Sequence, residues 1–115
     1  MAKVYVVQQH LKMDHDRVLR PKFNLEPARE FGELVFCLHE DALPQNGQSV
    51  LDQLRSTLSD IQEGDYILPI GSTILMCLTA VVAAEFTPKL NFLYWSGRHG
   101  NYLAMGYDLD APELI

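Results

Sequence analysis

The stretch that most constrains the fold lies at residues 66–86, YILPIGSTILMCLTAVVAAEF. It opens with a short apolar run, and such a run with little alternation is typical of a strand covered on both faces. Gly71 permits a backbone geometry that a Cβ would penalise. Ser72 or Thr73 can cap a following helix by accepting a hydrogen bond from a free amide. The helix predicted from residue 74 onward is apolar almost all round, so it must be central or shared with a partner subunit.

A membrane span is the competing interpretation of this stretch. The uninterrupted apolar run is about half of the roughly 20 residues that a bilayer needs. Pro69 and Gly71 also interrupt the segment on one side. We therefore expect no insertion into a membrane.

Composition indicates a soluble globular protein. The chain has 115 residues, of which 48% are hydrophobic and 21% charged, and this length favours one domain over residues 1–115 with a core of its own. The formal net charge of −6 argues against binding to a nucleic-acid backbone, which requires clustered Lys and Arg. We expect an acidic protein that binds proteins or a small ligand rather than nucleic acid.

The two cysteines, Cys37 and Cys77, both fall inside elements predicted to be buried. Free buried thiols are typical of a reducing compartment, and no Cys/His spacing indicates zinc. The N-terminal sequence MAKVYVVQQH has no signal-peptide apolar region. The sequence therefore predicts a cytoplasmic location (the host cytoplasm if the protein is viral), with no metal and no cofactor.

The other elements follow from periodicity and turn residues. A helix is predicted from Ser49, because Ser49–Asp52 has the S-x-x-D form of a helix start, and Gly64 is placed to end it. Residues 9–29 are polar and contain two prolines, which indicates a long loop or arm. Residues 110–115 form a tail that we expect to be frayed. Strands are predicted at residues 3–8, 33–38, 66–70, 90–95 and 102–109, and the buried stripe of the first helix at Val50, Leu51, Leu54, Leu58 and Ile61.

The predicted order of elements is β-β-α-β-α-β-β. Its middle consists of two consecutive crossovers, which are almost always right-handed and produce a parallel sheet. The last two strands are joined by the glycine-flanked turn SGRHGN, so they form a hairpin. The fold class is α/β, a small three-layer Rossmann-like sandwich with a mostly parallel sheet and a C-terminal antiparallel hairpin.

Topology indicates where a ligand would bind, because open parallel sheets bind ligands at the carboxyl ends of their strands. A helix N-terminus there attracts anions, and an arginine can hold phosphate or carboxylate. Gln9 and His10 join this edge if the first strand is also parallel. The candidate ligand-binding residues are Gly71, Ser72, Thr73, Arg98, His99 and His39.

Each candidate also has a structural explanation. The Gly-Ser-Thr segment can be a tight turn with an N-cap, and it matches neither G-x-x-x-x-G-K nor G-x-G-x-x-G. Arg98 and His99 can be exposed residues of a hairpin turn, and His39 can be part of a polar strand exit. The sequence lacks the G-x-S-x-G elbow of serine hydrolases, so no catalytic residue is predicted.

Two resemblances accompany these patterns. The run DYILPIGST…AVVAAEF, continued by LNFLYW and a closing hairpin over residues 65–107, resembles small uncharacterised proteins of phages and mobile elements. That resemblance implies no known activity. The turn of Gly71, Ser72 and Thr73 before a helix is also similar to that of CARF-type Rossmann domains, which implies that a cyclic oligonucleotide could bind there.

Two functions remain open at this point. The first is a non-enzymatic accessory protein, of phage or mobile-element origin, that acts by binding a protein partner or by self-association as a homodimer. The alternative is a Rossmann-like protein that binds, and could cleave, a nucleotide or cyclic oligonucleotide at the carboxyl edge of the sheet. In that case Arg98 and Ser72 would hold phosphate, and His99 or His39 would be the acid or base.

Overall fold

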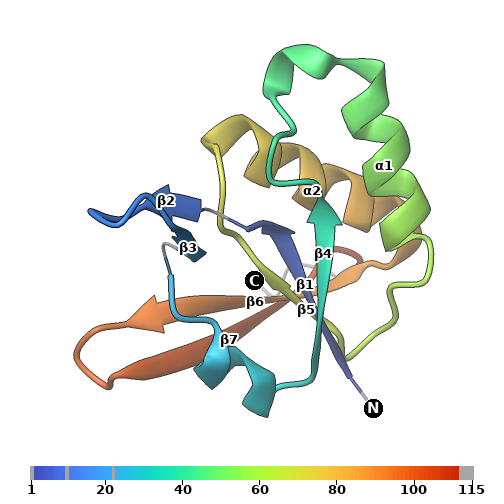
Figure 1. Ribbon diagram of the computed structural model, residues 1–115. Helices are drawn as coiled ribbons and strands as arrows, with labels where there is room; N and C mark the ends of the chain where they lie inside the picture. The colour runs from blue at the N-terminus through green and yellow to red at the C-terminus, as the bar shows by residue number, and fades with distance from the viewer. Residues whose placement is uncertain (1, 10, 22, 112–115) are drawn as a thin grey trace.

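The computed structural model describes residues 2–9, 11–21 and 23–111, and its centre is a five-stranded sheet accompanied by two α-helices (Figure 1). The strand order is β4-β1-β5-β6-β7, with β7 antiparallel to β6 and the other neighbours parallel. This confirms the predicted α/β class, the mostly parallel sheet and the C-terminal hairpin. The bounds are β1 Lys3–Gln8, β4 Glu33–Leu38, α1 Gln48–Leu58, β5 Tyr66–Leu68, α2 Thr73–Phe86, β6 Lys89–Ser96 and β7 Asn101–Asp108.

Both α-helices lie on one face of the sheet (Figure 1). The connections from β4 to β5 and from β5 to β6 run in the same direction across the sheet, so two right-handed crossovers place α1 and α2 side by side. Arg55 of α1 joins Glu85 of α2 through two hydrogen bonds of 3.0 and 3.2 Å. The opposite face is covered by a short 3-10 helix, η1 (Glu26–Glu30), instead of an α-helix.

Two apolar clusters form the core, one on each face of the sheet. The side chains of β1 alternate between them, as they must in a strand: Tyr5 and Val7 face the helices, and Val4 and Val6 face η1. The buried stripe predicted for the first helix is confirmed at Val50, Leu54 and Leu58, with Leu51 packed against it, whereas Ile61 is buried but lies beyond the end of the helix. The η1 cluster consists of Val4, Val6, Ala28, Leu68, Ile70, Leu93 and Tyr102.

The arm at residues 9–29 has structure of its own. Strands β2 (Leu11–Met13) and β3 (Leu19–Pro21) form a separate antiparallel hairpin. Its turn is organised by the Asp14 carboxylate, which accepts hydrogen bonds from the amides of Asp16 and Val18. Apolar alternation is absent from this segment because these short strands are held by local polar bonds rather than by a core.

Three predictions about local structure are wrong. Helix α1 begins at Gln48 after Gly47, which has no side chain to cap it, so Ser49 lies inside the helix. The helix ends at Leu58, well before Gly64. Cys77 is exposed, because it lies on the outer side of α2. Cys37 is buried as predicted, and burial raises the pKa of its thiol to about 12. The tail prediction concerns residues 110–115, of which 112–115 lie outside the described residues.

Among the described residues, no helix is both long and apolar enough to cross a bilayer. At 14 residues, α2 is shorter than the roughly 20 residues that a span needs.

Candidate functional site

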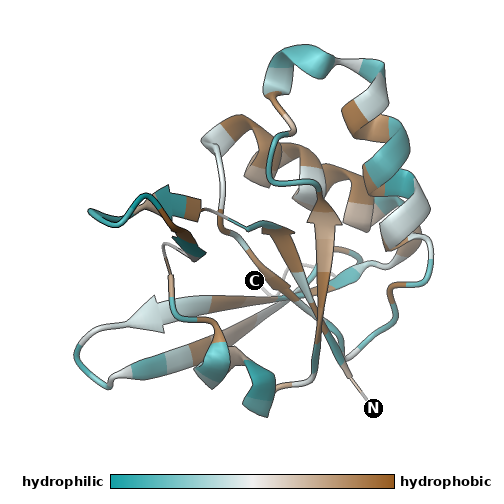
Figure 2. Ribbon diagram, in the orientation of Figure 1, coloured by the Kyte–Doolittle hydropathy of each residue, from teal (hydrophilic) through white to brown (hydrophobic). Residues whose placement is uncertain are grey.

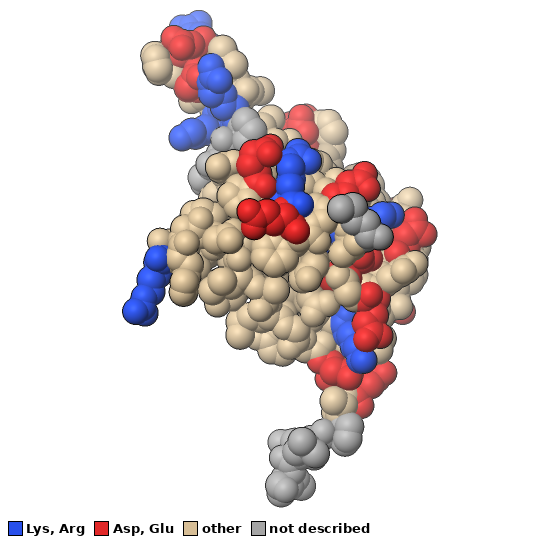
Figure 3. Space-filling view, turned by 90° about the horizontal axis from the view of Figure 1, so that it is seen from below, with Lys and Arg blue, Asp and Glu red and all other residues tan. Residues whose placement is uncertain are grey.

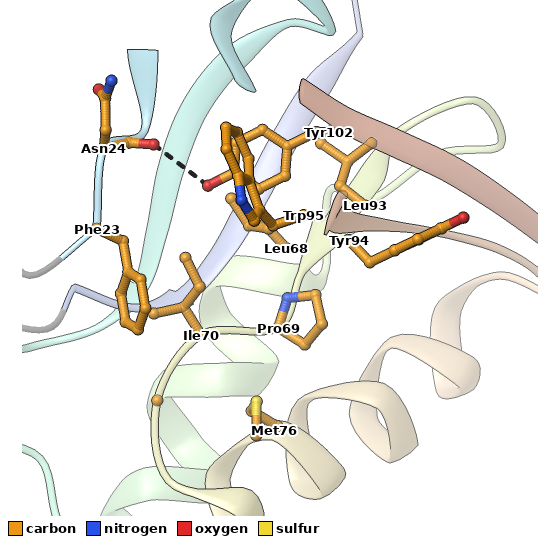
Figure 4. A pocket seen from close by; sticks show the side chains of 11 residues that line it. Phe23, Asn24, Leu68, Pro69, Ile70, Met76, Leu93, Tyr94, Trp95 and Tyr102 are labelled. Atoms are coloured by element: carbon orange, nitrogen blue, oxygen red, sulfur yellow. Dashed lines mark hydrogen bonds between the residues drawn. The ribbon is translucent and has the colours of Figure 1, made fainter. Parts of the chain in front are cut away.

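An apolar cleft of about 600 Å³ opens at the carboxyl edge of the parallel sheet, between the arm and the β6–β7 hairpin (Figure 4). This volume falls within the range of small-molecule sites, roughly 300–1,000 Å³. The cleft is built from three segments that are distant in sequence. Phe23 and Asn24 come from the arm, Pro69, Ile70 and Gly71 from the loop after β5, and Trp95 and Tyr102 from the hairpin.

Aromatic rings provide much of the wall of this cleft. Trp95 and Tyr102 are directly paired across the hairpin, and their rings pack edge to face at 5.1 Å. The Tyr102 hydroxyl donates a hydrogen bond of 3.3 Å to the carbonyl of Asn24, which fastens the arm to the hairpin (Figure 4). Trp95 is half exposed. None of the described residues that line the cleft carries a charge, so its contacts suit a flat, neutral group.

The position of the cleft depends on the end of β1. The main-chain amide of Gln8, the last residue of β1, donates a hydrogen bond of 3.1 Å to the Ile70 carbonyl. The loop after β5 is therefore bonded to β1. A Cβ on Gly71 would lie 3.3 Å from the Gln8 side chain, and its φ is +135°. Glycine is therefore required there by close approach and by backbone conformation. This explains the glycine in the predicted turn.

Gln8 also ties this edge to the loop after β4. Its buried side-chain amide nitrogen lies 2.8–3.2 Å from the carbonyl oxygens of His39, Glu40 and Ala42. These carbonyls follow the end of β4 and have no partner strand, so a buried donor is needed to satisfy them. Gln8 thus fixes the loop that carries one of the predicted site residues, His39.

The structure disperses the predicted site residues. Gly71 lines the cleft, and Ser72 is the N-cap of α2, with its hydroxyl oxygen accepting from the Leu75 amide at 3.2 Å. Thr73 is the first residue of that helix. The N-cap interpretation of Ser72 is therefore confirmed, whereas a ligand role for these residues stays a prediction.

Arg98 and His99 lie in the exposed hairpin turn between the end of β6 and the start of β7. The Ser96 hydroxyl and His99 Nδ1 are 2.7 Å apart and close this turn locally. His39 is exposed, and its Nδ1 accepts a hydrogen bond from the Asp41 amide. Strands β4 and β6 are three positions apart in the sheet, about 14 Å at the usual spacing. One small anion therefore cannot contact both His39 and Arg98 at those strand ends.

Strand β1 is parallel to its neighbours, as the inclusion of Gln9 and His10 at this edge requires. Gln9 lines a second depression, between the arm and β4, rather than the aromatic cleft. His10 lies outside the described residues. Among the described residues, no group of three His, Cys, Asp or Glu side chains could hold a metal ion.

Sequence reasoning missed the aromatic cleft residues. In the hairpin, Tyr102 is buried whereas Trp95 is half exposed, and alternation along a strand does not show which aromatic ring will line a cleft. Phe23 is an isolated aromatic residue in a polar segment. A lone aromatic residue in a polar segment was the one signal in the sequence that the arm packs against the apolar cleft.

A second unusual surface is the outer side of α2. Figure 2 shows this helix coloured hydrophobic along most of its length, whereas polar residues interrupt α1. Ile74 and Val81 are 58% and 62% exposed, and Cys77 and Ala84 are exposed beside them. A helix on the surface of a globular protein normally turns charged residues to water. Of the two positions predicted for this helix, the central one is excluded because one side of the helix faces solvent, and a side shared with a partner subunit stays a prediction.

The hairpin carries a third apolar surface. Met105 and Tyr107 of β7 are 48% and 53% exposed. They are paired with Phe92 and Leu90, which pack into the core on the helix side of the sheet. The opposite side of the sheet, seen from below Figure 1, also has a broad area without charged side chains (Figure 3).

Comparison with known proteins gives one finding about origin. Residues 2–109 match the family model described as Phage Pam3 gp32-like protein. No curated protein and no solved structure matches the chain. The resemblance to small phage proteins is thereby confirmed. Because the match covers almost the whole chain, including the arm, both helices and the hairpin, this protein belongs to the Phage Pam3 gp32-like protein family.

Proposed function

We propose that this phage protein is a non-enzymatic accessory protein that acts by binding other protein chains, including copies of itself. The observation that carries this proposal is the exposed apolar side of α2, formed by Ile74, Cys77, Val81 and Ala84. Exposed apolar patches on small proteins commonly mark interaction sites. Glu85 is the only charged residue in the 14 of this helix, so the surface is poorly adapted to water and well adapted to an apolar partner.

The expected result is that Val81→Lys abolishes this binding without unfolding the protein. A lysine at an exposed position leaves the core intact, but it places a charge in an apolar contact at a cost of about 3 kcal/mol, or roughly a hundredfold in affinity. The measurement compares proteins retained by tagged wild type and by the variant from phage-infected cells, together with sedimentation of the purified proteins.

The matched control is Ser56→Lys, which adds the same charge to the exposed polar side of α1. Partners that remain with Ser56→Lys and are lost with Val81→Lys support the proposal. Equal retention by all three proteins, with unchanged sedimentation, contradicts it.

A second candidate function is supported by the aromatic cleft. Its place at the carboxyl edge of the parallel sheet is where such folds bind ligands, and Trp95 offers a half-exposed ring on which a base could stack. In this alternative a nucleotide or cyclic oligonucleotide lies with its base in the cleft and its phosphate toward Ser72 and Arg98.

The chain has one tryptophan, so quenching of Trp95 fluorescence by mono-, di- and cyclic nucleotides reports directly on the cleft. We expect a binding nucleotide also to raise Tm, because a ligand bound by the folded state alone stabilises it. Arg98→Ala should weaken that binding at least tenfold through loss of the phosphate contact. Binding unchanged in both Arg98→Ala and Ser72→Ala contradicts the phosphate assignment, and a flat screen removes this candidate.

A further inference from the structure

Strand β7 presents an unpaired edge. It is the last strand of the sheet, and among the described residues no strand pairs with its outer side. Such an edge offers a row of free amides and carbonyls to another chain. Natural edge strands are usually protected by being short, or by Lys, Pro or a bulge. β7 has eight residues in continuous register with β6, and its sequence NYLAMGYD contains neither Lys nor Pro.

The ladder fixes which groups of β7 point outward. The Leu109 amide donates to the Pro88 carbonyl at 2.8 Å, immediately after the register in which Lys89 opposes Asp108. Residues of an antiparallel pair alternate between bonding to the partner strand and facing away from it. Odd-numbered residues of β7 therefore bond to β6. The outward amides and carbonyls belong to Tyr102, Ala104, Gly106 and Asp108.

These four outward residues are complementary to themselves. In an antiparallel pairing of two copies about a twofold axis at Met105, Tyr102 opposes Asp108 of the other copy and Ala104 opposes Gly106. The central pair of Ala104 and Gly106 then exchanges its outward groups directly. At the ends, the Tyr102 amide would exchange its 2.8 Å bond to Asn101 Oδ1, and the Asp108 carbonyl its 3.4 Å bond from the Ala111 amide, for bonds to the other copy. A twofold axis perpendicular to the sheet also keeps corresponding faces together, so Leu103 lies opposite Tyr107 on the helix side.

Charge permits this contact although the chain is acidic. Asp108 is the only charged residue of β7, and the two Asp108 side chains would stand at opposite ends of the ladder. Six residues at about 3.4 Å each separate them by about 20 Å, more than the Debye length of about 8 Å. Meanwhile Met105 and Tyr107, about half exposed in the single chain, come together on one face.

The other edge of the sheet is less available. Strand β4 is shorter, with six residues. It packs against α1, and its last residues, Cys37 and Leu38, are buried. The edge of β7 is therefore the one that combines length, free amides and exposed apolar side chains.

We propose that two copies of this protein join β7 to β7 and continue the sheet across the pair. This inference rests on the proposed function, since it names a second copy as one of the bound chains, but it uses a surface separate from α2.

The test is Ala104→Pro, measured by sedimentation equilibrium. Proline is tolerated at an edge strand where the lost amide faces outward, so the fold is retained while the shared ladder loses its two central amide donors. We expect the wild type to be dimeric and Ala104→Pro to dissociate at least tenfold more readily. Ala104→Val keeps the amide and should dimerise like the wild type.

A second measurement fixes the register without depending on that proline. In a Cys77→Ser background, Met105→Cys places two thiols opposite each other at the twofold axis, in a non-hydrogen-bonded pair with Cα atoms about 4.5 Å apart. That separation allows a disulfide, so mild oxidation should give a covalent dimer. Leu103→Cys, which would oppose Tyr107, should give none.

The outcomes separate the inference from the proposed function. A monomeric wild type overturns the pairing of β7. A dimeric wild type that is unaffected by Ala104→Pro, and that fails to crosslink through Met105→Cys, also overturns it. In that second case, dissociation by Val81→Lys would show that association uses α2 and would leave the proposed function standing.

Discussion

Replacing Gly32 with alanine should lower the free energy of unfolding by about 3 kcal/mol, the upper end of the cost of overpacking. A Cβ on Gly32 would lie 2.1 Å from the Ala2 carbonyl oxygen, a distance that the backbone cannot accept. That oxygen receives the Glu33 amide at 3.3 Å at the start of the β1–β4 pair. The substitution therefore pushes β1 and β4 apart at the point where their hydrogen bonds begin. Urea denaturation of the variant and the wild type measures the loss.

Gly97→Ala is the matched control for this prediction. Its added Cβ would have its nearest neighbour, Trp95 Nε1, at 4.0 Å, and its φ lies outside the left-handed region. We expect a change within about 0.5 kcal/mol. Similar losses for the two variants would show that the contact between Gly32 and Ala2 does not determine stability.

The second large effect is expected at alkaline pH. Tyr5 is buried, and its hydroxyl has no hydrogen-bond partner among the described residues. Burial first, and then the charges of Asp65 and Asp60, raise its pKa to about 12. The unfolded chain loses this proton from about pH 10, whereas the folded protein keeps it until about pH 12. Stability therefore falls as pH rises through that window, by about 1.4 kcal/mol for each pH unit.

Tyr5→Phe should remove this loss, and at neutral pH it should add about 1 kcal/mol by deleting an unsatisfied buried polar group. The measurement is urea denaturation at pH 7, 9, 10 and 11. Cys37 contributes a separate alkaline loss, because its own raised pKa of about 12 gives the same sign from about pH 9. The effect of Tyr5→Phe is therefore measured in a Cys37→Ala background. Tyr94→Phe, which changes an exposed tyrosine, is the control in the same background. A Tyr5→Phe profile parallel to that of its parent would contradict the assignment.

Most elements of the fold were predictable because each is indicated by several residues within its own stretch of sequence. Strand β1 is an uninterrupted β-branched and aromatic run, and α1 has buried residues at helical spacing. The hairpin follows from two apolar runs around a glycine-flanked turn. The crossover rule then predicted the parallel direction of β4, β5 and β6 without any knowledge of contacts, whereas the insertion of β1 between β4 and β5 was not predicted.

The candidate site was less predictable because it is made by contacts between distant segments. Strand order separates His39 from Arg98, and no local pattern shows that β1 and β5 lie between them. The aromatic cleft requires the arm to return to the hairpin through Tyr102 and Asn24, residues 78 positions apart. Apolar content alone likewise could not show that one side of α2 would be left in water, since burial depends on how much sheet lies beneath the helix.

The place of β1 between β4 and β5 has a consequence for synthesis on the ribosome. This strand precedes both of its neighbours in the chain, yet it cannot be enclosed until β4 and then β5 have been made. Folding of the nascent chain must therefore wait for long-range pairing, a slow step in which apolar strands are exposed. We expect Tyr5, Val6 and Val7 to be a segment that host chaperones contact before the hairpin emerges.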